Sequence, residues 1–305
     1  MIKKLTQPIK WHGGKHYLAN WIIGNMPPHL HYVEPFFGGG SVLLARDSDR
    51  DWLSAGGEKL PSYNRGCSEV VNDLHGELTN FWRTLQDPAD FDVFRRRVEL
   101  TPLSEVEWSD AGETPDESDR VGRAVHFFIR ARQSRQGLMK DFATLSRNRT
   151  RRRMNEQVSS FLTAIEGLDD IHTRLKSVVI LRKDACQVIE QQDGPHTLFY
   201  CDPPYLQETR VTTTAYAHEM TESDHERLLH TLGEIEGKFL LSGYTSRLYD
   251  DYAATKGWHR SDRMIDNKAS GRKQKEQKCE CLWSNYVAAA NPSEGCTLAT
   301  TDRSP

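Results

Sequence analysis

Short apolar runs alternate with longer amphipathic stretches along most of the chain. Runs rich in Val, Ile, Leu and aromatic residues predict strands at residues 32–33, 69–73, 178–181, 197–201, 239–244, 258–265 and 280–283. Elsewhere, apolar residues recur every three or four positions, which predicts helices around residues 17–23, 74–98, 121–129, 154–167, 188–189, 221–232 and 246–255. Strands that alternate with helices in this way indicate an α/β fold built around one sheet.

The stretch between the second and third predicted strands is helical in pattern. We therefore expect residues 80–168 to form a helical insertion that does not belong to the sheet. The flanking parts, residues 1–79 and 169–287, then form one discontinuous α/β domain. The composition of residues 288–305, which are small and polar, predicts a disordered tail.

Three polar stretches predict loops inside this framework. Residues 48–68 are polar and rich in glycine, and residues 206–221 are rich in threonine, as expected of a lid-like loop. Residues 99–119 contain two prolines and a glycine, which favours a mobile loop over a helix.

Charge changes this picture within the helical insertion. The chain has 305 residues and a formal net charge of −3, which does not favour a uniformly basic nucleic-acid binder. However, residues 99–119 carry eight acidic side chains and no Lys or Arg, whereas residues 120–153 carry eleven basic ones against Asp141. Such a basic block predicts a phosphate-binding surface, and a solvated helix face is the alternative.

Cysteine usage and hydropathy exclude several classes of protein. The six cysteines are scattered, so they do not suggest a disulfide framework, and a reducing cytoplasm is expected. Cys279 and Cys281 lack a second ligand pair nearby in the sequence, and we expect no metal site there. No apolar run approaches the roughly 20 residues that span a bilayer, so no membrane association is expected.

A glycine-rich turn follows the first strand. In His31–Leu44, HYVEPFFGGGSVLL, a short strand ends at Glu34-Pro35, three glycines make a tight turn, and Ser41 is expected to cap the next helix. A strand, a glycine turn and a helix N-terminus together can cradle a nucleotide-like ligand. The next strand ends in Asn72-Asp73, where an acid in such folds binds ribose hydroxyl groups. Gly13-Gly14-Lys15 lacks the spacing of a phosphate-binding loop.

A second strand ends in a chemically distinctive way. The run TLFYCDPPY, residues 197–205, is an apolar strand that stops at two consecutive prolines, which cannot continue a central strand. This stop presents the Asp202 carboxylate, the carbonyl groups of Pro203 and Pro204, and the ring of Tyr205. Together they could hold a flat heterocycle with an exocyclic amino group, and a plain proline turn is the alternative.

The motifs and their order closely resemble the Dam-type DNA adenine methyltransferases, in which cofactor motifs come first, target recognition second and catalysis third. The resemblance covers roughly residues 7–286 and rests on PIKWHGGK, VEPFFGGGSV, the strand ending in Asn72-Asp73, CDPPY, FLLSGY and ECLWSNY. It implies a Rossmann-like methyltransferase sheet with a helical target-recognition insertion. It also implies S-adenosylmethionine as cofactor and adenine in double-stranded DNA, flipped out of the helix, as substrate.

The resemblance assigns roles residue by residue. It implies cofactor binding by Trp11, Lys15, Glu34, Pro35, Phe36, Gly38, Gly40, Asp73, Asp184 and Asp202. It implies catalysis by Asp202, Pro203, Pro204 and Tyr205, with Asp202 and the Pro203 carbonyl accepting the two amino protons and Tyr205 stacking on the base. No metal is required by this chemistry.

DNA binding is expected from residues 130–153, which we call the basic segment, and from the N-terminal motif PIKWHGGK, residues 8–15. The candidates are Lys10, Arg130, Arg132, Arg135, Lys140, Arg147 and Arg149. Readers of GATC in this family carry Asn at the position of Ser134, and the segment differs further after Gly137. The recognition sequence is therefore left open, and so is the arginine that reads it. A monomer is expected, with a cognate restriction enzyme as a candidate partner.

Two other functions fit parts of this pattern. An RNA or protein-glutamine methyltransferase would share the cofactor motifs, but those enzymes more often carry Asn in place of Asp202. A catalytically idle DNA-binding module would share the basic segment, but it would not need Asp202 and Tyr205.

The basic segment predicts that DNA affinity depends steeply on salt, because Lys and Arg side chains that neutralise phosphates release counterions. Dissociation constants for duplex DNA, measured over a range of salt concentrations, are expected to rise strongly with salt. A flat dependence would contradict the assignment of residues 130–153 to DNA binding.

Overall fold

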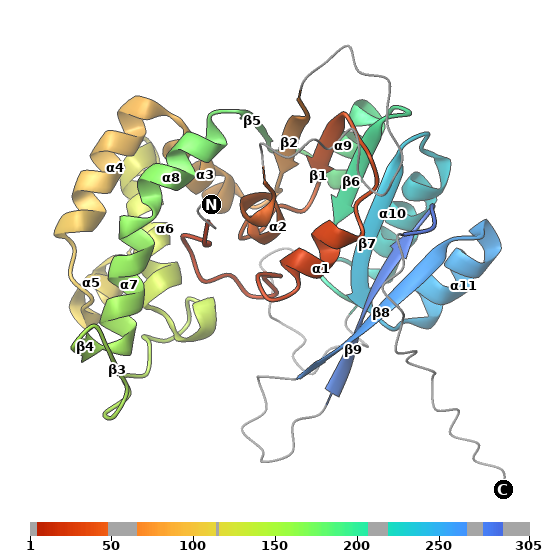
Figure 1. The fold of residues 1–305 in the computed structure, drawn as a ribbon. Helices are drawn as coiled ribbons and strands as arrows, with labels where there is room; N and C mark the ends of the chain where they lie inside the picture. Colours follow the sequence, from red (N-terminus) through yellow and green to blue (C-terminus); the bar gives the residue numbers. More distant parts are fainter. Residues whose placement is uncertain (1–4, 48–65, 114–115, 207–218, 267–276, 289–305) are drawn as a thin grey trace, which may run out of the picture.

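Seven strands pair into one sheet in the order β5-β2-β1-β6-β7-β9-β8 within the residues that the structure, a computed structural model, describes: 5–47, 66–113, 116–206, 219–266 and 277–288 (Figure 1). In chain order these strands are β1 (His31–Glu34), β2 (Ser68–Asn72), β5 (Val178–Leu181), β6 (Thr197–Cys201), β7 (Lys238–Tyr244), β8 (His259–Asp266) and β9 (Gln277–Ser284).

Parallel pairing brings the carboxyl ends of the central strands to one edge. Val33 of β1 pairs with Val70 of β2 on one side and with Phe199 of β6 on the other, and both pairings are parallel. β5 and β7 continue the parallel part, whereas β9 runs antiparallel to β7 and β8 antiparallel to β9. The predicted α/β fold is therefore confirmed, and ligands of such sheets bind at this edge.

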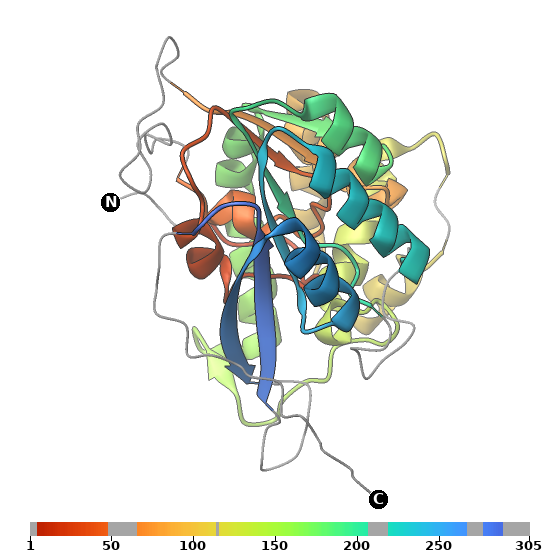
Figure 2. The same cartoon turned by 90° about the vertical axis from the view of Figure 1, so that its right-hand side faces the viewer.

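Strand residues alternate between two apolar layers, as the pleat of a β-sheet requires. Tyr32, Leu198 and Leu240 belong to one buried cluster, and Val33 and Phe199 belong to the other. The second layer is covered by α9 (Ala185–Gln192), α10 (Glu222–Glu234) and α11 (Arg247–Lys256), which lie in front of the sheet in Figure 2. The first is covered by α1 (Ala19–Gly24), α2 (Ser41–Ala45) and α3 (Gly76–Gln86).

Most of the remaining helices lie beside the sheet, and we call residues 76–175 the helical layer (Figure 1). It consists of α3, α4 (Pro88–Leu100), α5 (Glu105–Asp110), α6 (Arg120–Gln133), a 3₁₀ turn η2 (Arg135–Gly137), the ribbon β3 (Thr150–Arg151) and β4 (Met154–Asn155), α7 (Glu156–Glu166) and α8 (Leu168–Leu175). The insertion expected from the sequence spans residues 80–168. The helical layer begins earlier, at residue 76, and ends later, at residue 175. Among the described helices, none combines the length and the apolar character needed to cross a membrane.

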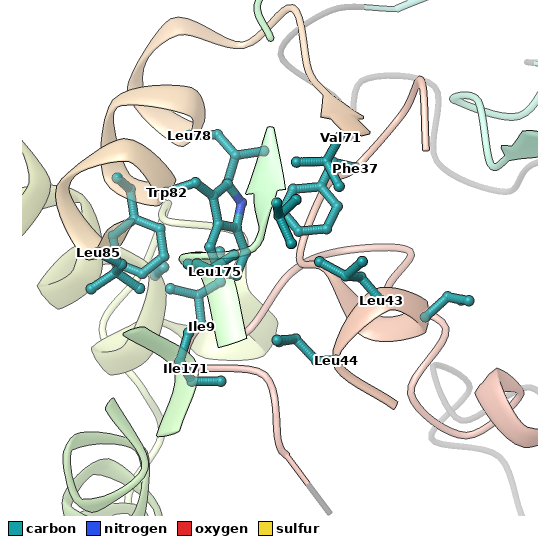
Figure 3. Close-up of a cluster of buried hydrophobic side chains, with 14 of the residues drawn as sticks. Ile9, Phe37, Leu43, Leu44, Val71, Leu78, Trp82, Leu85, Ile171 and Leu175 are labelled. Carbon is teal, nitrogen blue, oxygen red and sulfur yellow. The ribbon is translucent and has the colours of Figure 1, made fainter. Parts of the chain in front are cut away.

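Trp82 of α3 joins the helical layer to the glycine turn after β1. Its ring is 1% exposed and lies 4.9 Å from the ring of Phe37, centroid to centroid. Figure 3 shows both side chains in one cluster with Leu43, Val71 and other apolar residues. The Trp82 indole N–H donates to the carbonyl oxygen of Gly38 over 3.0 Å. This hydrogen bond fixes the turn against the helix.

Two expectations from the sequence are wrong. Residues 99–119 are not all loop, because Ser104 accepts a hydrogen bond from the Val106 amide and caps α5, a helix too short to show a period. Ser41 does not cap α2: Gly40, with φ of 69°, is the N-cap, and no side chain provides the capping bond. The expected loops at 48–68 and 206–221 and the tail at 288–305 lie mostly outside the described residues.

A buried ionic group connects β2 to α8 and to the residue that follows α2. Glu69 of β2 is 6% exposed and pairs with Arg46, just after α2, and with Arg174 of α8, whose Nη1 lies 2.6 Å from Glu69 Oε2. Arg46 also bonds His29 Nε2 over 2.8 Å. Two buried guanidinium groups thus depend on one carboxylate.

Glu69→Ala is expected to lower the free energy of unfolding by about 3–5 kcal/mol, because it removes the carboxylate that two buried guanidinium groups share. Urea unfolding followed by circular dichroism measures this change. Arg247→Ala, which breaks the exposed ion pair with Asp251, serves as the control and should change the free energy by no more than about 0.5 kcal/mol. A loss for Glu69→Ala that is no larger than this control would refute the role of the buried group.

Candidate active site

A cavity of about 240 Å³ opens at the carboxyl edge of the parallel strands. The segments that leave β1, β2, β5 and β6 line it, because parallel pairing sets these four strand ends side by side. Of the residues expected to bind a cofactor, it is lined by Trp11, Lys15, Glu34, Pro35, Phe36, Gly38, Asp73, Asp184 and Asp202. Gly40 shapes the turn but does not line the cavity.

The glycine turn leaves room for a ring where a side chain would stand. Gly38 has φ of 51°, and a Cβ added there would lie 2.9 Å from Nε1 of Trp11. The Trp11 ring therefore packs directly against the turn, and its centroid lies 5.9 Å from that of His75. This close approach requires glycine for both its backbone angle and its missing side chain.

Asp73 follows β2 and holds the glycine turn. Its Oδ2 accepts the Gly38 amide N–H at 2.9 Å, and its Oδ1 accepts the His75 amide N–H at 2.9 Å. The carboxylate lies between two strand ends and faces the cavity. It can accept further hydrogen bonds from a ligand hydroxyl group, since each carboxylate oxygen has two lone pairs.

Asp184 caps α9 and forms a two-pronged ion pair with Arg227 of α10. The Arg227 nitrogens lie 3.1 Å from Oδ1 and 2.7 Å from Oδ2. Burial opposes ionisation of Asp184, but the hydrogen bonds from Arg227 and from the Gln187 amide hold its pKa below the usual value. A carboxylate is therefore maintained in the lining of the cavity.

Asp202 begins the turn after β6 and pairs with Lys15. The Lys15 Nζ lies 2.8 Å from Asp202 Oδ1, and the two side chains are 6% and 18% exposed. Burial raises the pKa of Asp202 above its usual value, while the charge of Lys15 pulls it back. Pro203 and Pro204 line the cavity beside this pair. The sequence therefore brings the Asp202 carboxylate and two prolines into the lining of the cavity.

Tyr205 is 7% exposed and is not among the residues that line the cavity. Its hydroxyl donates to Oε1 of Glu280 on β9, and Lys15 Nζ lies 4.6 Å from its ring centroid. Glu280 is 1% exposed, and burial raises its pKa while Lys15 lowers it. Glu280 was not among the predicted site residues, although its strand was.

Glu34 ends β1 at the floor of the cavity and is buried. Tyr32 donates its hydroxyl to Glu34 Oε1 over 2.7 Å. Burial raises the pKa of Glu34 from 4.5 to about 8, despite this hydrogen bond and the charge of Arg46. Glu34 is thus a neutral carboxylic acid at pH 7, whereas Asp184 is ionised.

Lys10 lies outside the cavity. Its Nζ donates to Gln157 Oε1 of α7 at 3.0 Å, and burial, with help from nearby Arg132, lowers its pKa to about 8. Gly137 packs against it: a Cβ there would lie 2.4 Å from the Lys10 carbonyl oxygen. The basic segment therefore contacts, through Gly137, the N-terminal segment that leads into Trp11.

The predicted DNA-binding arginines divide into two groups. Arg132 is 8% exposed and donates to the carbonyl and hydroxyl oxygens of Ser160, and Arg130 covers the Trp108 ring at 3.6 Å. Direct DNA contact by Arg132 does not fit this position, because its guanidinium is buried among protein acceptors. The others are exposed and remain candidates: Arg135, Lys140, Arg147 and Arg149.

One group of side chains in the described residues could hold a metal ion, formed by Asp262, Cys279 and Cys281. It lies on β8 and β9 and does not line the cavity. Arg260 donates to both oxygens of Asp262, at 2.7 and 3.1 Å, so this carboxylate already has a cationic partner. This group is therefore not part of the candidate active site.

Several cavity residues were missed from the sequence. Glu219, Met220, Asp224 and Arg227 line the cavity from the start of α10. The capping pattern Thr221–Asp224 located this helix, but it could not show that the helix begins beside Asp184. The available signal was the opposite charge of Asp184 and Arg227. It could not be used, because the two residues are far apart in the sequence.

A sequence model of the D12 class of N6 adenine-specific DNA methyltransferases matches residues 11–267. The match includes the glycine turn, Asp73, the helical layer and the Asp202–Tyr205 segment.

Individual relatives agree with this match at low identity. The chain is 23% identical to the type II methyltransferase M.MjaIII of Methanocaldococcus jannaschii, over 91% of this chain and 98% of the relative. It is 22% identical to a DNA adenine methylase of Vibrio cholerae, over 90% and 95% respectively. It is 25% identical to a DNA N-6-adenine-methyltransferase of Escherichia phage P1, over 73% of this chain and 27% of that longer protein.

The raised pKa of Glu34 predicts a pH dependence of stability. Between pH 4.5 and about 8 the native state holds a proton that the unfolded state releases, so this contribution is complete below 4.5 and is lost as pH rises through about 8. Glu34→Gln should make the free energy of unfolding depend less on pH. At about pH 9 the variant's free energy of unfolding should be higher than the parent's by on the order of 3 kcal/mol. Chemical unfolding at several pH values tests this. Identical curves for parent and variant would refute it.

Proposed function

Because the chain belongs to the D12 class of N6 adenine-specific DNA methyltransferases, we propose that it methylates a specific adenine in duplex DNA with S-adenosylmethionine as donor. The family gives the reaction class, and the donor, the residue roles and base flipping are our proposal. The observation that carries it is the position of Asp202, which joins the cavity wall to Lys15 and to the proline turn.

The residues around the cavity fit the proposed donor. Asp73 offers acceptors for ribose hydroxyl groups, and the ionised Asp184 offers one for the amino group of the donor's adenine. Phe36, Val42 and Pro35 also line the cavity and supply apolar surface, and Trp11 packs against the glycine turn. When bound, the donor supplies a methyl group on a positively charged sulfur, which departs as a neutral thioether.

Asp202 and the Pro203 carbonyl would accept the two protons of the target amino group. These hydrogen bonds draw electron density toward the nitrogen and aim its lone pair at the methyl carbon. Asp202 also receives the proton that the nitrogen loses once the new carbon–nitrogen bond has formed. A carboxylate whose pKa is raised by burial is suited to this transfer.

A base inside a duplex cannot reach Asp202, so the enzyme would flip the target adenine out of the helix, at a cost of a few kcal/mol. Stacking on Tyr205 would return roughly 1–3 kcal/mol. In the structure Lys15 lies over the Tyr205 ring, and the ring does not line the cavity. Stacking therefore requires that Lys15 move aside and uncover the ring.

The DNA duplex is proposed to lie along the exposed part of the basic segment. Support comes from Arg135, Lys140, Arg147 and Arg149, which are exposed, and from the contact of Gly137 with Lys10 at the entrance to the Trp11 segment. Phosphates would meet the basic side chains while the flipped base enters the cavity.

The relatives suggest a biological setting. The archaeal relative is named a type II methyltransferase, and the others come from a bacterium and a phage. We propose action on DNA in a prokaryotic or phage-infected cell, with a cognate restriction enzyme as a partner.

Asp202→Ala is expected to abolish adenine methylation, because the target amine loses its proton acceptor. Sequencing that detects modified bases, applied to DNA from expressing cells, should reveal methyladenine at one short motif for the parent chain and none for the variant. Asp251→Ala, an exposed change on α11, controls for expression and should preserve the mark.

Calorimetry on the purified parent chain would measure binding of S-adenosylmethionine separately. Methyladenine produced by Asp202→Ala would refute the catalytic role. Binding of the donor without any adenine mark would instead move the substrate to RNA or protein.

A further inference from the structure

Glu280 is a buried carboxyl group beside the proposed catalytic residues that has no role in the function described so far. It lies on β9, opposite Tyr244 of β7 and Arg263 of β8. It does not line the cavity, so a direct contact with the donor is not expected. Burying a carboxyl group costs free energy unless its hydrogen bonds or charge are satisfied, so the contacts of Glu280 matter.

Those contacts reach two residues of the proposed chemistry. Tyr205 donates its hydroxyl to Glu280 Oε1, and Lys15 Nζ lies 3.7 Å from the same oxygen. The Tyr244 ring meets the Tyr205 ring edge-on, with centroids 4.7 Å apart. Glu280 and Tyr244, paired across two strands, therefore fix both the hydroxyl and the ring of Tyr205.

Lys15 stands where the target amino group is proposed to act. Its ammonium bonds Asp202 Oδ1 at 2.8 Å and lies 4.6 Å from the centroid of Tyr205. A flipped adenine needs the same carboxylate and the same ring. Lys15 must therefore leave Asp202 when the base enters, and a buried ammonium that moves needs another anion. Glu280 Oε1 is a second carboxylate oxygen within reach.

We propose that Glu280 is a positioning residue for methyl transfer: it anchors the Tyr205 hydroxyl and takes over Lys15 when the target amino group occupies Asp202. The proposal rests on the proposed roles of Asp202 and Tyr205. It makes Lys15 a shared cation that alternates between two carboxylates, and it assigns Glu280 to substrate entry and not to donor binding.

Glu280→Gln tests this role with little change of shape. Its amide oxygen still accepts the Tyr205 hydroxyl, but it offers no charge to Lys15, which then stays on Asp202. At saturating DNA the single-turnover rate should fall by about tenfold to a hundredfold. The dissociation constant of S-adenosylmethionine should remain within error of the parent, since Glu280 does not line the cavity. The melting temperature should also remain within error, because the amide keeps the hydrogen bond from Tyr205 and Lys15 keeps its ion pair with Asp202.

The assay uses full-length protein, donor labelled in its methyl group, and genomic DNA from cells that lack adenine methylation. The matched control is Asp262→Asn, which neutralises a paired carboxylate on the adjacent strand at the position facing Cys281. That side chain is not in the proposed machinery, so this variant should keep the parent rate.

The outcomes separate this inference from the proposed function. A reduced single-turnover rate for Glu280→Gln, with donor binding like that of the parent, supports the positioning role. A Glu280→Gln rate within about twofold of the parent, with Asp202→Ala inactive, overturns the inference and leaves the function intact. Loss of donor binding in Glu280→Gln also overturns it, because the residue would then support the cavity. Full activity of Asp202→Ala would refute the proposed function itself.

Discussion

A buried ammonium group needs an anion, and this need organises the site. Lys15 comes from the segment before α1, Asp202 from the end of β6 and Glu280 from β9, three parts far apart in the sequence. Each of these groups offsets part of the free-energy cost of burying the others. The ion group therefore holds the N-terminal segment over the sheet edge, and it does so at the point where the proline turn leaves the sheet.

The cavity keeps its acids in different states by giving them different neighbours. Glu34 is fully buried with one hydroxyl donor, so it stays protonated, while Asp184 has a guanidinium partner and stays charged. Asp202 lies between these extremes, since burial and Lys15 act in opposite directions. One small volume thus offers a neutral, a charged and an adjustable carboxyl group, which suits a ligand that is charged at one end and planar at the other.

The strands and site residues that depend on local sequence pattern could be predicted. The side-chain contacts between residues far apart in the sequence could not. Apolar runs identified the strands, and the parallel order then brings Asp73, Asp184 and Asp202 together without further information. Glu280 was missed because one polar residue in a short strand usually faces solvent, whereas here a neighbouring strand and Lys15 cover it. Arg132 was assigned to DNA because charged side chains are mostly exposed, but Ser160 on α7 provides acceptors inside the helical layer. No pattern in the sequence shows which helix will face it.

The contact between Gly137 and the Lys10 backbone has a consequence for how the lineage can change. Any side chain at position 137 would collide with the backbone of Lys10, and the left-handed backbone angle there also favours glycine. On the proposed function, variants that read a different DNA sequence must therefore change residues around Gly137 and keep the glycine itself. The spacing between the proposed DNA-reading segment and the segment that leads into Trp11 would then stay the same in such variants.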